Sequence, residues 1–233
     1  MKRPTRLSVR SVGLATALIL AVGALGTGLA ASAASPTRVG LGTADAFAVL
    51  AGSGITNTGP TTITGDVGTF PTTTISGFPP ATVNGTNHAG DAVTQTAKTD
   101  LVTAYGDAAG RGPTSPVVAD LGGQTLAPGV YNSASSIGLT GAVTLSGTST
   151  DVWIFQAGST LTTATGSSVV LTGGAQSCNV FWQVGSSATL GTGTAFVGSV
   201  LALASISLTT GATVSGRVLA RTGAVTKIGR AHV

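Results

Sequence analysis

The second half of the chain repeats one pattern of apolar and small polar residues every 18 to 20 residues. Each unit holds an apolar run followed by two shorter stretches in which apolar residues alternate with Thr, Ser or Ala. The clearest units begin at Val180, Val200 and Val218, and residues 49–66 match residues 200–217. A short repeat rich in β-branched residues is typical of β-solenoids, in which each repeat forms one coil. The pattern predicts an all-β solenoid of about six three-faced coils.

One segment departs from this pattern and predicts a single long helix. Residues 91–109 contain few glycines, and Gly110 follows as a stop. Apolar residues recur there every four positions, with Lys98 off their stripe: Val93, Ala97, Leu101 and Tyr105. The helix needs an apolar surface to cover, and strands buried on both sides read as continuous apolar runs. The first face of the solenoid is therefore expected to hold the helix, on the runs at residues 152–155, 180–184, 200–204 and 218–220.

The second strand of each coil alternates differently and leaves a small, hydroxylated, nearly charge-free row outside. Its inward residues are expected to be Val143, Leu145, Leu161, Leu190, Ile206, Leu208 and Val225. The outward residues are then Thr56, Ala142, Thr144, Thr160, Thr162, Ser187, Thr189, Ser205, Ser207, Ala224 and Thr226. A rival row of the same kind lies on the third face: Thr62, Thr64, Thr213 and Ser215.

The charge of the chain changes once its two ends are set apart. The whole chain of 233 residues has a net charge of +4, but four cations lie in the first ten residues. Residues 1–33 combine this basic start with an apolar run and Ala31-Ser32-Ala33, which predicts a secretory signal peptide; a retained membrane anchor is the alternative. Residues 34–226 then hold five cations against seven aspartates, a balance of −2. This balance removes the electrostatic basis for binding nucleic acid. The signal peptide predicts a secreted protein that has no membrane contact after cleavage.

Residues 227–233 break the texture of the chain abruptly. Their sequence, Lys-Ile-Gly-Arg-Ala-His-Val, back-translates to a common sequencing-adapter sequence. We expect a non-native read-through tail, with a short natural tail as the alternative, and a domain that covers residues 34–226.

Several motifs in one order resemble the ice-binding-like family of secreted microbial antifreeze proteins. The resemblance covers about residues 41–226 and rests on the motifs at residues 41–51, 63–68, 121–131, 153–156, 174–182 and 216–221. It implies a discontinuous, right-handed β-helix with one long helix alongside, in which the N-terminal coil stacks on the C-terminal coils. It also implies that the flat second face binds ice. Residues 222–226 come near a Thr-Ala/Gly-x-Thr/Asn pattern found in the family, with one extra residue.

The residue types also bear on other functions. Polysaccharide-cleaving solenoids need clustered acids, whereas the seven aspartates here are scattered singly and His88 is the only His before residue 232. No zinc cluster, phosphate loop or nucleophile elbow occurs, so we expect no catalysis, cofactor or metal. A non-catalytic adhesin or matrix module that binds carbohydrate or protein is the alternative function. Exposed aromatic side chains would favour sugar binding, but Trp153 and Trp182 lie in apolar strands and are expected in the core.

Three further expectations concern single groups and assembly. Cys178, the only Cys, precedes an apolar strand and is predicted to be a buried, inert thiol. Asp66 and Arg217 occupy equivalent places in coils expected to be neighbours, which predicts a structural ion pair. The protein is expected to act on ice as a monomer.

Overall fold

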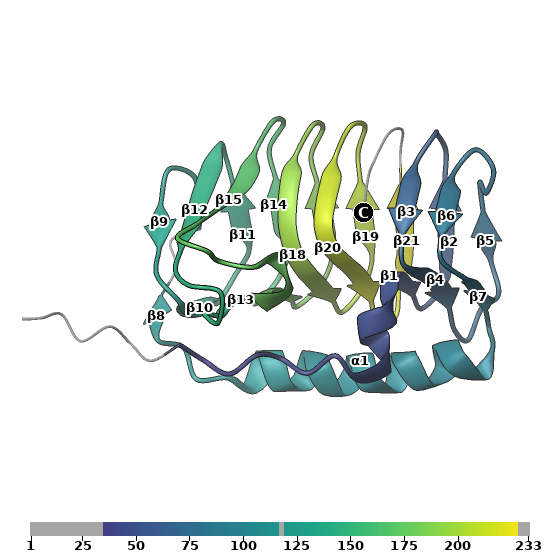
Figure 1. Cartoon of the computed structure of the whole chain (residues 1–233), viewed down its shortest axis with the longest axis horizontal. Coiled ribbons are helices and arrows are strands. Elements are labelled where there is room, and N and C mark those ends of the chain that lie inside the picture. The colour runs from purple at the N-terminus through teal and green to yellow at the C-terminus, as the bar shows by residue number, and fades with distance from the viewer. Residues whose placement is uncertain (1–34, 117–118, 228–233) are drawn as a thin grey trace, which may run out of the picture. The chain divides into compact units, whose positions relative to one another are not determined.

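The computed structural model describes residues 35–116 and 119–227. The predicted signal peptide lies outside these described residues. Of the predicted tail at residues 227–233, only Lys227 is described, and it is the last residue of a strand that starts at Ala224. Within them, no helix is long and apolar enough to cross a membrane. The strands pair in parallel throughout, in two large sheets and one small one, and a single long helix accompanies them (Figure 1).

The largest sheet has twelve strands and forms two of the faces. Nine of them follow the order β7-β4-β1-β20-β18-β16-β13-β10-β8, and β15, β12 and β9 branch from β18. The N-terminal members are β1 (Phe47–Ala51), β4 (Asp66–Thr69) and β7 (Asn87–Ala89). The others are β8 (Ser115–Pro116), β9 (Thr125–Leu126), β10 (Gly129–Ser133), β12 (Ala142–Ser146), β13 (Trp153–Ala157), β15 (Ser168–Thr172), β16 (Val180–Val184), β18 (Ala195–Ala202) and β20 (Thr213–Ala220).

The strands β18 and β20 are long because they bend from the third face into the first. Gly198 and Gly216 pair at this bend. Both have positive φ, 110° and 153°, and a Cβ on Gly198 would lie 2.7 Å from the carbonyl oxygen of Val180. Only glycine fits such a corner without strain. A glycine at this position therefore allows the two successive coils to bend in the same way.

The second face is a separate sheet of seven short strands in the order β11-β14-β17-β19-β21-β2-β5. Its strands are β2 (Gly54–Asn57), β5 (Ile75–Ser76), β11 (Ile137–Leu139), β14 (Leu161–Thr163), β17 (Ala188–Leu190), β19 (Ile206–Leu208) and β21 (Ala224–Lys227). A two-stranded sheet of β3 (Thr62–Thr64) and β6 (Thr82–Asn84) continues the third face. Short 3-10 helices occupy η1 (Gly42–Ala46) and η2 (Ser177–Asn179).

The N-terminal strands stack on the C-terminal ones, as the family resemblance implied. Strand β1 lies between β20 and β4, with Leu50 opposite Leu219. Strand β2 lies between β21 and β5, with Thr56 opposite Thr226. Both sheets therefore continue without a gap from the C-terminal strands to the N-terminal strands, although these strands are far apart in the sequence. We call this meeting of the two ends the junction.

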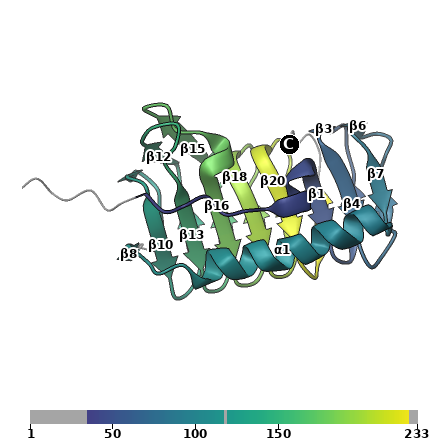
Figure 2. The ribbon, with the colours of Figure 1, turned by 60° about the horizontal axis from the view of Figure 1, so that its bottom comes forward.

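The predicted helix is present as α1 (Ala92–Gly110) and covers the first face (Figure 2). Asp91 caps its N-terminus by accepting a hydrogen bond from the Thr94 amide. The residues that pack on the sheet are Ala97, Leu101, Ala104 and Ala108. Two expectations were wrong: Val93 is 51% exposed, and Lys98 is buried. The buried apolar stripe of the helix thus consists of three alanines and Leu101, and Tyr105 is only partly buried.

Two buried clusters hold the fold together, one inside the coils and one between α1 and the first face. Trp153 and Trp182 are fully buried, as predicted. Inside the coils, the ring of Phe155 stacks on Trp182 at 4.0 Å and on Tyr131 at 5.4 Å between ring centroids. Such aromatic stacks and close-packed aliphatic residues keep the outer faces rigid.

Two expectations for single groups were wrong. Cys178 is exposed, because it lies in η2 before strand β16 rather than within the buried strand. Asp66 and Arg217 do not pair, because β1 intervenes between their strands. Arg217 instead contacts the Asp45 carboxylate at 3.0 Å, and Asp66 accepts a hydrogen bond from the Thr86 amide.

Candidate functional site

The seven-stranded sheet presents an outward row in which one small residue from each strand lies beside the next. The pairing register places these residues in line: Gly138, Thr162, Thr189, Ser207, Thr226, Thr56 and Ser76. Thr56, Thr162 and Thr189 are exposed, whereas Ser207 and Thr226 are half-buried. We call this line the middle row.

The residues that alternate with the middle row fill the core. They are almost fully buried, and include Ile55, Ile137, Leu139, Leu161, Ala188, Leu190, Ile206, Leu208 and Val225. Both neighbours of Thr56, Thr162, Thr189 and Ser207 are buried, so the backbone from which each of these outward side chains projects is held in place. The row is a rigid array rather than a set of loop residues.

A second row runs parallel to the first, two residues earlier in the chain, in or just before each strand, and we call it the lower row. It holds Ser136, Thr160, Ser187, Ser205, Ala224, Gly54 and Thr74. Several hydroxyls bind the adjacent strand: Ser187 Oγ accepts from the Ser205 amide at 3.3 Å, and Ser205 Oγ accepts from the Ala224 amide at 3.2 Å. The hydroxyls of Ser136 and Thr160 lie 2.8 Å apart. These contacts restrict the rotamers of Ser136, Thr160, Ser187 and Ser205.

Ala142 and Thr144 were predicted in this outward set and do not belong to it. Both lie on β12, which pairs with β15 and β9 in the twelve-stranded sheet. Their buried neighbours Val143 and Leu145 lie on that face as well. The second-face strand of this coil is β11, whose outward residue is Gly138. Alternation correctly predicted the direction of these side chains but not their face.

The sequence analysis also missed both ends of the rows. Gly138 has no side chain to mark it, and Ser76 lies in a second N-terminal turn, outside the repeat units described above. A signal for this turn exists: residues 82–86 (Thr-Val-Asn-Gly-Thr) resemble residues 62–66 (Thr-Ile-Thr-Gly-Asp) twenty positions earlier, and Ile75 follows Ile55 by the same interval.

The surface carries little charge. Of the residues that form the seven strands, Lys227 alone is charged. Asp120 lies at the β11 edge, where its carboxylate accepts hydrogen bonds from the Thr140 hydroxyl and from the amides of Gly122 and Thr140. The Thr140 hydroxyl and these amides lower the pKa of Asp120 below its usual value. Asp120 also forms a parallel bridge with Gly138, so this carboxylate lies at the end of the stack and is bound to its backbone.

The third face, the rival site, is less regular. Thr213 and Ser215 lie on β20, whereas Thr62 and Thr64 lie on β3, which pairs only with β6 among the described residues. Val170, which projects from this face on β15, is 40% exposed. The rival residues do not form one continuous row in the part of the chain that the structure describes.

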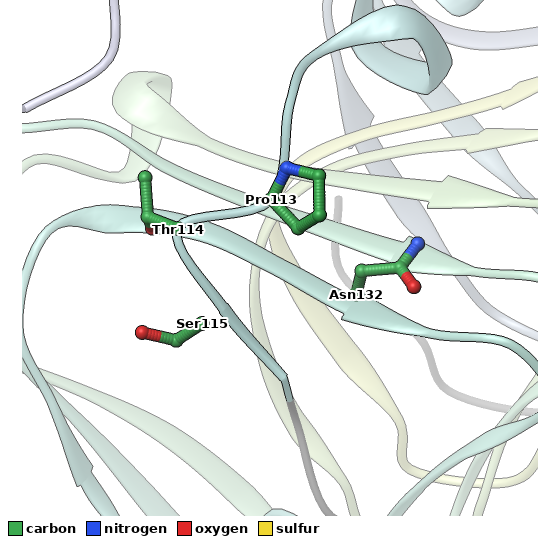
Figure 3. A pocket seen from close by; sticks show the side chains of 4 residues that line it. All are labelled: Pro113, Thr114, Ser115 and Asn132. Carbon is green, nitrogen blue, oxygen red and sulfur yellow. The ribbon is translucent and has the colours of Figure 1, made fainter.

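Hollows elsewhere on the surface offer little chemistry. One hollow beyond the end of α1 is lined by Pro113, Thr114, Ser115 and Asn132, none of which ionises in the usual pH range (Figure 3). A second hollow is lined partly by Asp45 and Arg217, which pair with each other. Within residues 35–116 and 119–227, no three His, Cys, Asp or Glu side chains are grouped to hold a metal ion.

Comparisons with known proteins converge on one family. The model of the family described as "Ice-binding-like" matches residues 49–231. An ice-binding protein from Nostoc sp. (strain HG1) is 53% identical over 190 residues, which cover 80% of this chain and 70% of that protein.

Solved structures agree in fold. The crystal structure of an ice-binding protein from an Antarctic biological consortium is 50% identical, with a TM-score of 0.82, and covers 84% of this chain and 91% of that one. An ice-binding protein from the Antarctic ascomycete Antarctomyces psychrotrophicus is 42% identical, with a TM-score of 0.80 and coverage of 84% and 98%.

Proposed function

The chain belongs to the ice-binding-like family, and we propose that it adsorbs to ice through the middle and lower rows and thereby inhibits ice growth and recrystallisation. One observation carries this proposal more than any other. The middle row runs in register across seven strands, so the surface repeats itself over its whole length. The proposed site residues are Thr56, Thr160, Thr162, Ser187, Thr189, Ser205, Ser207, Ala224 and Thr226, joined by Ser76, Thr74, Ser136 and Gly138.

Ice presents a repeating array of water oxygens without charge or pocket, so a protein that recognises it needs a matching repeat. Neighbouring strands give one spacing of about 4.8 Å, and alternate residues along a strand give a second of about 6.7 Å. Seven strands extend the first spacing over about 29 Å. A two-dimensional array of this size holds many water molecules in fixed positions at once.

The side chains suit that task. Methyl groups of Thr and Ala order the water beside them, while hydroxyl groups anchor it by hydrogen bonds. Thr162 and Thr189 are exposed, and their β-branched side chains are stiff. In the lower row, Ser187 and Ser205 are held by backbone amides of the next strand. The surface is therefore ordered before it meets ice, which reduces the entropy lost on adsorption.

Several properties complete the proposal. The domain is a right-handed β-helix of about six coils, which the parallel pairing and the family relationship support. It acts without catalysis: the relatives are named ice-binding proteins, and His88 is bound to Asp91 at 2.6 Å rather than placed in a cleft. It is secreted by means of a leader at residues 1–33 and acts as a monomer, because a flat face needs no second copy to reach ice.

The test compares two Tyr substitutions on different faces. Thr189→Tyr places a bulky ring in the middle row, and Ser215→Tyr places the same ring on the exposed third face. We expect wild-type protein to show thermal hysteresis and to inhibit recrystallisation. Thr189→Tyr should lose most of both activities and Ser215→Tyr should retain them, with melting temperatures close to wild type because both positions are exposed.

Two outcomes would contradict the proposal. If only Ser215→Tyr abolished activity, the third face would be the site. If a folded wild-type protein neither shaped nor inhibited ice crystals, the function itself would be wrong.

A further inference from the structure

The junction between the N-terminal and C-terminal strands differs from the other corners of the fold. The corner from first to second face comprises residues 203–205 between β18 and β19, and residues 221–223 between β20 and β21. Between β1 and β2 it comprises residues 52–53, one residue fewer. The corner that stacks on residues 221–223 is therefore too short to repeat their hydrogen bonds.

The usual bonds are clear one coil earlier. The Arg221 amide donates to the Ala202 carbonyl at 2.8 Å, and the Thr222 amide donates to the Leu203 carbonyl at 3.0 Å. The register pairs Ala202 with Ala220, so the equivalent acceptors at the junction are the carbonyls of Ala220 and Arg221.

The short corner sends its amides elsewhere. Gly52 and Ser53 both donate to the Gly223 carbonyl, at 2.9 and 3.1 Å. The approach is close, since a Cβ on Gly52 would lie 2.6 Å from the Arg221 carbonyl oxygen. The carbonyls of Ala220 and Arg221 thus do not receive the corner amides that their equivalents receive.

The side chain of Lys98 takes the place of those amides. Its Nζ donates to the Ala220 carbonyl at 2.6 Å and to the Arg221 carbonyl at 2.5 Å, and the residue is only 8% exposed. The Arg221 guanidinium lies over the Tyr105 ring, 4.6 Å from its centroid, in a cation–π contact with the same helix. One helix residue therefore supplies both donors that the shortened corner lacks.

We propose that Lys98 is a positioning residue for ice binding, which holds the N-terminal strands in register with the C-terminal strands of the same surface. Thr226 and Thr56 meet in the middle row directly after this corner. Strands β2 and β5 beyond the junction supply two of the seven strands of the row. This inference rests on the proposed function for its effect on ice, but its structural part is independent of that function.

Lys98→Met keeps the aliphatic stem and removes both donors, and Arg111→Met is the matched control. Arg111 is also a cation at α1, but it pairs with Asp107 and Thr37 far from the junction. Hydrogen exchange read by mass spectrometry should show at least a roughly tenfold faster exchange in peptides covering residues 47–57 and 218–227 of Lys98→Met. Peptides covering residues 153–163 should be unchanged, and Arg111→Met should not affect the junction.

The effect on ice is tested with a double-mutant cycle. Thr56→Tyr should reduce thermal hysteresis in wild type but add little to Lys98→Met, because the strand that carries it is already out of register. Thr162→Tyr, on the other side of the junction, should reduce it by the same factor in both backgrounds. Such selective coupling would not follow from a general loss of stability.

The outcomes separate the two proposals. Unchanged exchange at the junction of Lys98→Met, or equally faster exchange throughout, would overturn the role of Lys98. If Lys98→Met failed to fold, Lys98→Gln, which keeps one amide donor group, would replace it, and unfolding of both would show a global role instead. If wild type lacked ice activity, the proposed function would fail while the exchange experiment still decided on Lys98.

Discussion

Replacing Ser207 with tyrosine tests how far the seven strands act as one surface. Ser207 lies on β19, the fourth of the seven strands, so a ring there leaves three strands on either side. Each group of three spans about 10 Å, roughly one third of the intact length of about 29 Å. The tyrosine ring projects farther than the serine hydroxyl by more than one water–water hydrogen bond of about 2.8 Å, which lifts ice off the neighbouring strands.

Ser76→Tyr is the matched control, because Ser76 occupies the same row on the edge strand β5. That substitution leaves six contiguous strands, a span of about 24 Å or roughly four fifths of the whole. Thermal hysteresis at equal protein concentration should therefore fall sharply for Ser207→Tyr and only slightly for Ser76→Tyr. Equal losses from the two variants, with both folded, would refute the idea that the row acts through its contiguous length.

Three further predictions concern stability. Burial and the Arg221 charge lower the pKa of Lys98 from 10.5 to about 8, so between these pH values the unfolded chain binds a proton that the folded protein does not. The melting temperature of wild type should therefore rise as the pH increases from about 8 to 10.5, and that of Lys98→Met should change less. Gly52→Ala should lower the urea midpoint because its Cβ meets the Arg221 carbonyl, whereas Gly112→Ala, which meets nothing within 4 Å, should not. Hydrogen bonds from Thr94 and His88 lower the pKa of the capping residue Asp91 from 3.8 to about 2, so the stability that its carboxylate provides above pH 3.8 should be lost as the pH falls toward 2. Asp91→Ala should lower the free energy of unfolding in urea by about 1 kcal/mol at neutral pH.

Much of this architecture can be predicted from the sequence because each sequence repeat corresponds to one coil of the fold. A coil places the same residue types at the same faces, so apolar runs at Val180, Val200 and Val218 predict one buried face with its covering helix. The same logic found the N-terminal match at residues 49–66. The structure bears out both features.

What the sequence did not reveal depends on contacts between coils. Period-two alternation shows which residues point outward, but it does not distinguish the second face from the third, which is why Thr144 was misplaced. The outward position of β11 is Gly138, which carries no side-chain signal. In the sequence, Lys98 looks like a charge that faces solvent. Its role depends on the corner at residues 52–53, which is one residue short and leaves the carbonyls of Ala220 and Arg221 to the lysine.

The most direct test of the central claim is adsorption to a growing single crystal of ice. The exposed thiol of Cys178, in η2 and apart from the seven-stranded sheet, accepts a fluorescent maleimide and leaves the proposed surface free. Labelled wild type should be incorporated into the ice on defined planes, and labelled Thr189→Tyr should be excluded into the liquid. Incorporation of Thr189→Tyr to the same extent as wild type would contradict the account.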